Sequence, residues 1–420
     1  MSQTTRILLA LVAGLALGIG AVAVDREWAL RATGITGPLG SAWLHGLQMV
    51  IVPLVVGLLV TGVAAATDAA RAGAVAGRAV LCFVAVLWAT TLMAAALMPL
   101  LLDLWPLPAA WSAALRSALS AERAPGGTVP GLAAFFDNVV PGNVVAAAAG
   151  DAFLPLTVFA LVLAFAITRL NPERRRLMTE FFAALTDAML VIIGWVLKLA
   201  PIGVFALAYG VGAKTGAAAV GALAHYIVTV SSIGLVVIVA GYPAAWLLAR
   251  IGPGRFARAV APAQAVAVST QSSLASLPAM LEATGRLGAP APTAGIVLPL
   301  AVAVFRATSP AMNLAVALYV ARWLGVPIGA GALAAGIATA AITTMGSVSL
   351  PGTISYFASV APVALAMGVP IEALGLLVAV ETIPDLFRTV GNVTWDSVVT
   401  LTVARWSRED TAPANPPLRA

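Results

Sequence analysis

Residues 381–396 read ETIPDLFRTVGNVTWD, a polar stretch between the mainly apolar residues 371–380 and 397–404. Five of its side chains recur at spacings of three and four residues: Asp385, Arg388, Thr389, Asn392 and Asp396. On a helix this spacing places them along one face, with Glu381 one turn earlier. Charged side chains within a membrane are costly and normally face a partner or a cavity. The stretch therefore predicts a polar stripe on a buried helix.

Two interpretations of this stripe are open. In the first, Asp385 and Arg388 form an internal ion pair that holds helices together. In the second, the stripe binds a solute, because Arg388 can hold a carboxylate bidentately and Asp385 can accept from an ammonium group. Thr389 and Asn392 can then donate to further oxygens. An amino-dicarboxylate satisfies all of these groups.

The composition indicates that the bilayer surrounds this chain. The 420 residues are 61% hydrophobic and only 10% charged, which is too apolar for a water-soluble domain. The net charge of +6 comes from arginines beside apolar runs, which is typical of membrane proteins and excludes nucleic acid as a partner. The single cysteine, Cys82, and the separate histidines, His45 and His225, form no disulfide or zinc pattern, so we expect no cofactor.

Apolar segments of about 20 residues or more, long enough to cross the bilayer as helices, fill much of the first 249 residues. The predicted spans are 7–24, 43–66, 79–104, 145–168, 180–209 and 220–249. The first ends in Ala21-Val22-Ala23, as a signal peptide can, but its apolar run is long and a polytopic body follows.

Basic residues in the connecting loops predict the orientation of these spans. One side of an alternating threading carries Arg6, Arg71, Arg78, Arg169, Arg174, Arg175, Arg176, Arg250, Arg255 and Arg258. The other side carries fewer, namely Arg26, Arg31, Arg116, Arg123 and Lys214. We therefore expect a multi-pass protein of the cell inner membrane with cytoplasmic N- and C-termini. Residues 105–131 are then an extracytoplasmic loop, and residues 406–420 a disordered cytoplasmic tail.

After Arg258 the apolar segments are interrupted by polar residues and helix breakers. The three interruptions are STQSSLASLP (269–278), RATSP (306–310) and GSVSLPG (346–352). Non-helical backbone at membrane depth is tolerated only where it is buried in protein or lines a cavity. Paired broken segments are typical of the binding site of an inverted-repeat transporter. The chain is therefore expected to be a secondary transporter with its site in the C-terminal half.

In these residues the sequence resembles the dicarboxylate/amino acid:cation symporters, the family of the glutamate and aspartate transporters. The resemblance covers nearly the whole chain, and its most specific motifs are Ala200–Leu207, Ser272-Ser273 with Leu277-Pro278, Leu298-Pro299-Leu300, Leu350-Pro351-Gly352 and the polar pattern of residues 385–396. It implies an all-α protein of eight transmembrane helices plus two re-entrant helical hairpins. It also implies inverted repeats, a homotrimer and elevator-type alternating access.

The same resemblance implies a division of the chain into a scaffold and a transport domain. Residues 1–75 form scaffold helices 1–2, 132–215 form scaffold helices 4–5, and 76–104 form transport-domain helix 3. The remainder of the transport domain comprises residues 216–405, with helix 6, hairpin 1 at about 255–287, helix 7, hairpin 2 at about 328–368, and helix 8.

The resemblance also implies which residues meet the substrate. Its substrate-contacting positions are Ser273, Ser309, Asp385, Arg388, Thr389 and Asn392, and its gates at the hairpin tips are Ser272, Ser349, Leu350, Pro351 and Gly352. Asp385 would hold the amino group and Arg388 the side-chain carboxylate. This favours acidic amino acids, aspartate or glutamate, with C4-dicarboxylates and cystine as the alternatives.

The sequence departs from the resembled family at the cation sites. The family's Asn-Met-Asp-Gly-Thr motif reads FRATS at residues 305–309, and apolar side chains replace polar ones in the third helix, at Phe83, Val86 and Leu87. A residual sodium site would retain only Asn392 and Asp396, whereas hard cations need several oxygen ligands.

We hypothesise that Arg306 replaces a bound sodium ion as counter-charge and leaves protons or exchange to drive transport. Alternatively, Arg306 faces a water-filled crevice or pairs with Glu381. The chain has no HExxH or GxSxG motif, so we expect no enzyme. A channel or a transport-impaired sensor of the same fold stays open, because the sodium motif is altered.

Overall fold

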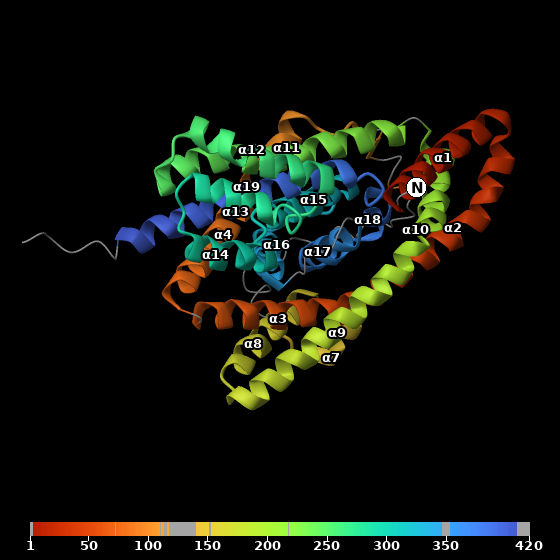
Figure 1. Cartoon of the computed structure of the whole chain (residues 1–420). Coiled ribbons are helices and arrows are strands. Elements are labelled where there is room, and N and C mark those ends of the chain that lie inside the picture. The colour runs from red at the N-terminus through yellow and green to blue at the C-terminus, as the bar shows by residue number, and fades with distance from the viewer. Residues whose placement is uncertain are drawn as a thin grey trace, which may run out of the picture.

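The computed structural model describes residues 3–71, 73–109, 111–112, 116, 140–150, 153–216, 218–346 and 353–409 (Figure 1). All regular elements in these ranges are helical. The helices are α1 (Gln3–Val24), α2 (Arg26–Gln48), α3 (Ile51–Arg71), α4 (Ala74–Leu104), α7 (Val144–Ala149), α8 (Phe153–Thr168), α9 (Pro172–Lys198), α10 (Ala200–Thr215), α11 (Ala218–Ala249), α12 (Pro253–Thr270), α13 (Leu277–Arg286), α14 (Ala291–Val304), α15 (Ser309–Leu324), α16 (Ala330–Gly346), α17 (Thr353–Ala366), α18 (Glu372–Leu377) and α19 (Thr382–Glu409).

Several helical segments in the described ranges are long and apolar enough to cross a bilayer. They are Thr5–Val24, Arg26–Ala65, Ala74–Leu104, Pro172–Lys198, Val220–Ala249 and Ala291–Leu324. Shorter apolar helices at Pro155–Thr168, Ala200–Lys214, Ala330–Met345 and Tyr356–Ala366 accompany them. The chain is therefore a multi-pass helical membrane protein, as predicted, and the count of eight transmembrane helices stays a prediction.

The predicted loop between the first two spans is wrong, because residues 26–42 belong to α2. Asp25 caps this helix by accepting a hydrogen bond from the backbone N–H of Trp28 at 3.1 Å. Glu27 and Arg31 form an ion pair at 2.9 Å, one turn apart. The charges that suggested a loop are thus the N-cap and an i,i+4 pair of a helix.

Three further boundaries differ from the prediction. Residues 145–168 are divided between α7 and α8, with Gly150 as the C-cap of α7. The span at 180–209 is broken at Leu199, because Pro201 lacks a backbone N–H and stands in the first turn of α10, which begins at Ala200. The predicted tail begins too early, since α19 continues to Glu409. Within this last part of α19, the hydroxyl of Ser407 accepts a hydrogen bond from Arg78 of α4. Residues 410–420 lie outside the described part of the chain.

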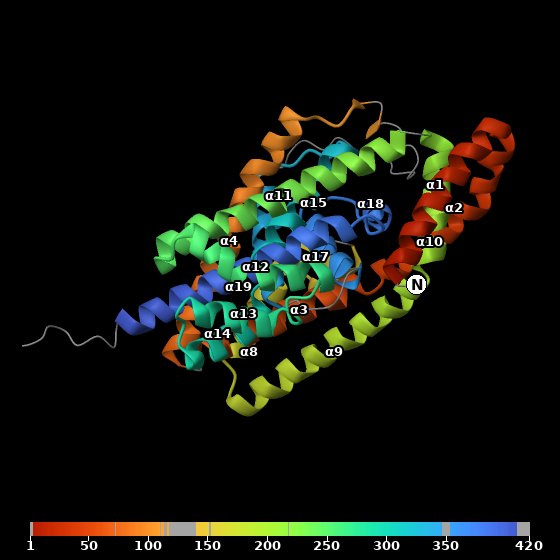
Figure 2. The ribbon, with the colours of Figure 1, turned by 45° about the horizontal axis from the view of Figure 1, so that its top comes forward.

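The helices α1, α2 and α10 pack together at one end of the molecule (Figure 1). Gly14 and Gly18 of α1 face α10 so closely that an added Cβ would lie 2.6 Å from the Phe205 oxygen and 2.4 Å from the Tyr209 oxygen. Small residues four apart permit such close backbone approach in membrane helices. Figure 2 shows α9 running along the outside of the bundle.

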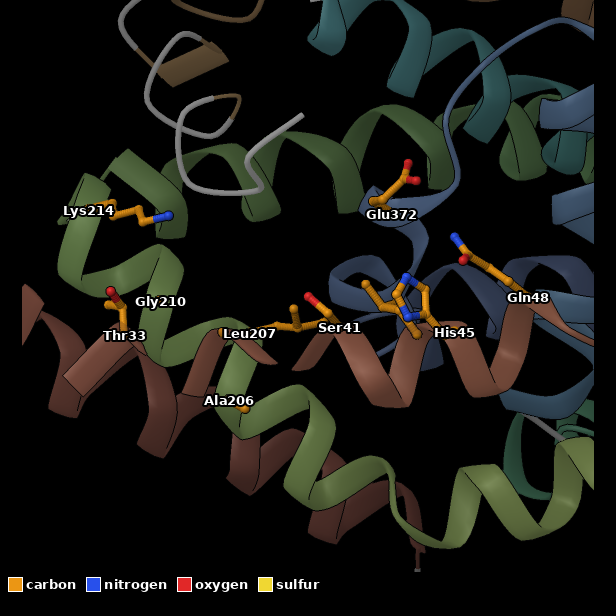
Figure 3. A pocket seen from close by; sticks show the side chains of 11 residues that line it. Thr33, Ser41, His45, Gln48, Ala206, Leu207, Gly210, Lys214 and Glu372 are labelled. Atoms are coloured by element: carbon orange, nitrogen blue, oxygen red, sulfur yellow. The ribbon is translucent and has the colours of Figure 1, made fainter. Parts of the chain in front are cut away.

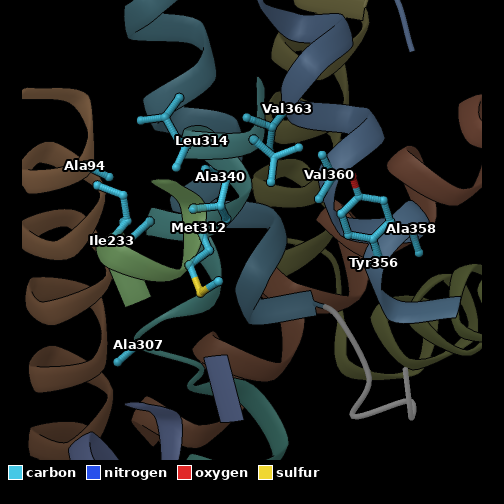
Figure 4. Close-up of a cluster of buried hydrophobic side chains, with 14 of the residues drawn as sticks. Ala94, Ile233, Ala307, Met312, Leu314, Ala340, Tyr356, Ala358, Val360 and Val363 are labelled. Carbon is cyan, nitrogen blue, oxygen red and sulfur yellow. The ribbon is translucent and has the colours of Figure 1, made fainter. Parts of the chain in front are cut away.

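The C-terminal helices form a second group around α19, which packs on α11, α12 and α14. Trp395 of α19 donates to the backbone oxygen of Val237 in α11 at 2.8 Å. The core beside it is apolar, and Figure 4 shows the part around Met312 of α15, with Ile233 and Val360 nearby. This packing removes the polar stripe of α19 from the lipid.

Candidate functional site

The predicted polar stripe lies on α19, and its side chains are buried within the protein. Asp385 is 9% exposed, Arg388 is 6% exposed and Asp396 is fully buried. Thr389 donates its hydroxyl hydrogen to the backbone oxygen of Asp385 at 2.9 Å. A single helix thus carries the whole stripe on its inner side, as the spacing predicts.

The guanidinium of Arg388 contacts two carboxylates through one nitrogen. Its Nη1 lies 2.7 Å from Oε1 of Glu381 and 3.0 Å from Oδ1 of Asp385. The internal ion pair of the first interpretation is therefore present. Nε and Nη2 of Arg388 have no hydrogen-bond partner within the described residues. They form one edge of the planar fork, which suits a two-oxygen anion.

The hairpin of α12 and α13 brings its serines to the start of α19. Gln271, in a left-handed conformation at the end of α12, donates to the backbone oxygen of Thr382 at 3.2 Å. Gln264 donates to the hydroxyl of Thr394 at 2.8 Å and fixes the other end of the contact. Ser273, two residues after Gln271, is buried. The Ser272 hydroxyl accepts from the backbone of Ala275, so this serine holds the tip in shape.

The predicted break in the seventh helix falls between Val304 of α14 and Ser309 of α15. Asn392 accepts a hydrogen bond from the backbone N–H of Thr308 at 3.0 Å, which supports the non-helical backbone from α19. The hydroxyl of Ser309 is buried and has no partner in the described part of the chain. The break therefore presents an unused hydroxyl beside the stripe.

The described residues do not fit a set of sodium ligands. Phe83 and Phe305, at two of the altered positions, stack with ring centroids 4.5 Å apart. Thr90 donates to the backbone oxygen of Ala307 at 2.8 Å. Asn392 already accepts from Thr308. Aromatic rings supply no oxygen, and hard cations require several oxygen ligands.

Arg306 and Asp396 occupy the same buried region. Arg306 is 8% exposed, and the charges of Asp385, Arg388 and Asp396 all act on it. Neither carboxylate oxygen of Asp396 has a hydrogen-bond partner among the described residues. The positive charge of Arg306 acts on this carboxylate, and its role as counter-charge stays a prediction. Glu381, the alternative partner predicted for Arg306, forms an ion pair with Arg388.

Part of the predicted site cannot be placed. The second hairpin tip, with Ser349, Leu350, Pro351 and Gly352, lies outside the described residues. The helices on either side of it, α16 and α17, pack against each other and against α15. The gate assigned to these four residues therefore stays a prediction.

Two residues that the sequence did not single out complete the surroundings of the stripe. Tyr226 of α11 donates its hydroxyl hydrogen to Oε2 of Glu381 at 2.9 Å. The hydroxyl of Tyr356 in α17 lies 3.4 Å from that of Tyr226. A tyrosine within an apolar run is a weak signal, because its ring also packs as an ordinary core residue. Tyr226 becomes notable only once Glu381 is seen beside it.

Two cavities lie away from the stripe. One, of about 240 Å³, lies among α2, α10 and α18 and is lined by His45, Gln48 and Glu372 (Figure 3). The other, of about 540 Å³, is mainly apolar and lies among α3, α4, α8 and α16, with Trp88 and Phe165 in its wall. Neither is lined by a residue of the predicted site.

Known proteins resemble the chain along almost its entire length. It is 25% identical to the proton/glutamate-aspartate symporter of Escherichia coli strain K12, over 97% of this chain and 93% of the relative. It is 26% identical to a C4-dicarboxylate transport protein of Rhizobium etli, over 89% and 83%. It is 29% identical to the neutral amino acid transporter B(0) of Homo sapiens, over 93% and 77%.

The family match is equally extensive. The sodium:dicarboxylate symporter family matches residues 4–406, which cover the described helices except for Gln3 at the start of α1 and the last three residues of α19. Its members are symporters and not enzymes. This match, together with the helical membrane fold, shows that the chain belongs to the sodium:dicarboxylate symporter family.

Proposed function

We propose that this chain is a secondary active transporter of acidic amino acids, aspartate or glutamate, and binds them at the stripe of α19. The free edge of the Arg388 guanidinium carries this proposal. Nε and Nη2 are buried donors without a partner among the described residues. Leaving a buried donor unsatisfied costs about 1–3 kcal/mol. A substrate carboxylate that accepts from both nitrogens removes this cost.

Asp385 supplies the second half of the recognition. One of its oxygens, Oδ1, contacts Arg388 at 3.0 Å. The other oxygen is the group that we assign to the substrate ammonium. Ser273, Ser309 and the amide of Asn392 are assigned to the remaining substrate oxygens, and the hydroxyl oxygen of Thr389, whose hydrogen is donated to Asp385, is assigned as an acceptor for the substrate ammonium. A zwitterion with a second carboxylate uses every member of this set.

The cation region supports coupling without sodium. Asp396 is fully buried and lacks a hydrogen bond in the described part of the chain, so its ionised form needs a positive charge to balance it. The Arg306 guanidinium acts on this carboxylate and is permanently charged. We assign to Arg306 the role that a bound sodium ion has in a sodium-coupled transporter.

The proposal includes elevator-type movement of the transport domain against the scaffold. The transport domain comprises residues 76–104 and 216–405, and the scaffold comprises residues 1–75 and 132–215. It is supported by the placement of α1, α2 and α10 at one end of the molecule, apart from α12 and α13 (Figure 1). A homotrimer in the cell inner membrane, with both termini cytoplasmic, completes the proposal. The arginine-rich loops support this orientation.

A C4-dicarboxylate is the second candidate substrate. Asp385 is already paired with Arg388, so a substrate without an ammonium group leaves this pair intact. Relatives named C4-dicarboxylate transport proteins also match most of the chain. Cystine and a transport-impaired sensor are further outcomes that the following experiment distinguishes.

Counterflow in proteoliposomes tests the proposed function. Vesicles loaded with unlabelled aspartate are expected to accumulate labelled aspartate from outside, and vesicles containing Arg388→Ala are not. Loading with succinate or cystine instead identifies the alternatives by the compound that drives exchange. If none of these compounds is exchanged, the proposal of a transporter is wrong and the transport-impaired sensor is the function that is left.

A further inference from the structure

Glu381 lies beside the proposed substrate groups without being one of them. It is 2% exposed and immediately precedes α19, and its backbone oxygen accepts from the N–H of Asp385 at 2.8 Å. Its Oε1 lies 2.7 Å from Nη1 of Arg388, the nitrogen that also contacts Asp385. Two carboxylates therefore share one guanidinium nitrogen, and a substrate would bring a third carboxylate to the same arginine.

The two oxygens of Glu381 differ in their surroundings. Oε2 accepts a hydrogen bond from Tyr226 of α11 at 2.9 Å. Oε1 forms the ion pair with Nη1 of Arg388, and no other group among the described residues bonds to it. Oε1 therefore has a second lone pair, unused by the described residues, that can take up a proton.

In the described ranges, the charged and titratable groups that face Glu381 come from α19, α11 and α17. Arg388 and Asp385 belong to α19, Tyr226 to α11 and Tyr356 to α17. The two tyrosines are neutral hydroxyls at ordinary pH. Arg388 is thus the positive charge that holds Glu381 ionised before substrate arrives.

The charge of the buried cluster identifies what must accompany the substrate. Among the described residues, two buried guanidinium groups, Arg306 and Arg388, accompany three buried carboxylates, so the ionised cluster carries one net negative charge. The carboxylates are those of Glu381, Asp385 and Asp396. Aspartate or glutamate adds another net negative charge, which a buried site of low dielectric strongly disfavours. A cation must enter with the substrate, and the side chains at the altered positions do not suit sodium.

On the basis of the proposed function, we propose that Glu381 is the residue that carries the coupling proton. It is ionised and paired with Arg388 when the site is empty. When a substrate carboxylate binds the Nε–Nη2 edge of Arg388, a proton from the water on that side binds Oε1 of Glu381. The proton and the substrate cross together, and both are released on the other side. One proton therefore moves with each acidic amino acid.

Binding of aspartate to the purified full chain, measured against pH, tests this assignment. In the unaltered protein the affinity is expected to be highest at low pH and to fall by up to about tenfold per pH unit once Glu381 ionises. Glu381→Gln keeps the shape of a neutral carboxyl group, so its affinity should be independent of pH. In proteoliposomes this variant should exchange aspartate but should not accumulate it when a pH gradient is applied.

Glu282→Gln is the matched control, because Glu282 is exposed on α13 and pairs only with the neighbouring Arg286 in the described structure. It should retain the pH dependence of the unaltered protein. If the unaltered protein binds no acidic amino acid at any pH, the proposed function fails. If it binds aspartate with the same pH dependence as Glu381→Gln, the role of Glu381 alone fails.

A measurement on the unaltered protein protects the test against misfolding of the variant. Adding aspartate in weakly buffered solution with a pH indicator should remove about one proton from solution for each substrate bound. Binding without proton uptake would overturn the assignment, whatever the behaviour of the variant.

Discussion

The ring of Phe83 on α4 stacks on that of Phe305, in the break between α14 and α15, with the two planes 12° from parallel. Both rings are fully buried. Their contact joins two segments far apart in the chain at the positions where the resembled family has polar residues. The stack is a packing contact that supplies no oxygen ligand, and Arg306 follows Phe305 directly.

Sodium is expected to have little effect on substrate binding. Replacing sodium with choline should change the affinity for aspartate by less than about twofold, because the oxygen ligands are too few. A titration of binding against sodium measures this. Arg306→Met should lose binding or make it depend on a cation, since Asp396 loses its counter-charge. A steep sodium dependence in the unaltered protein would refute the replacement of sodium by Arg306.

Arg388→Ala is expected to lower the affinity for aspartate by about 30-fold or more, because a buried charged partner is worth on the order of 2–5 kcal/mol. Arg388→Lys keeps the charge but not the fork, so it should also bind weakly. Isothermal titration of detergent-purified protein checks both. The exposed Arg322, paired with Asp103, offers Arg322→Ala as control. Near-normal affinity in Arg388→Ala would contradict the site.

Asp385→Asn is expected to separate the two candidate substrate classes. It should weaken aspartate more than succinate, because only aspartate presents an ammonium group to the carboxylate. The ratio of the two dissociation constants, relative to the unaltered protein, is the quantity to measure. Asp103→Asn, at an exposed ion pair, should leave the ratio unchanged. Equal losses for both compounds would show that Asp385 holds Arg388 and not the substrate.

Gly391→Ala is expected to destabilise the fold by about 1–3 kcal/mol through overpacking. An added Cβ would lie 2.1 Å from the hydroxyl oxygen of Thr308, whose backbone N–H is held by Asn392. Gly295→Ala in α14 is the control, because nothing lies within 4 Å of its added Cβ. Unfolding in detergent compares the two. If Gly391→Ala is as stable as Gly295→Ala, α19 and the break can separate without cost.

The sequence predicted features that depend on local spacing. The stripe from Asp385 to Asp396 follows from the helical period alone, and the break before Ser309 follows from polar residues and Pro310 in an apolar segment. The loop expected around Arg26 was wrong, because one charged side chain fits a capped, exposed helix as well as a loop. Local composition does not distinguish these two cases.

The amino-acid pattern is therefore sufficient to predict a helical membrane protein with a charged stripe in its last long helix. Which partner each charge has depends on the tertiary structure. Glu381 lies beside Arg388 and also meets Tyr226, which is 155 positions away. Contacts over such separations depend on how whole helices pack, and several pairings of the same charges satisfy the helical period equally well. The packing of α11 on α19 selects one of them.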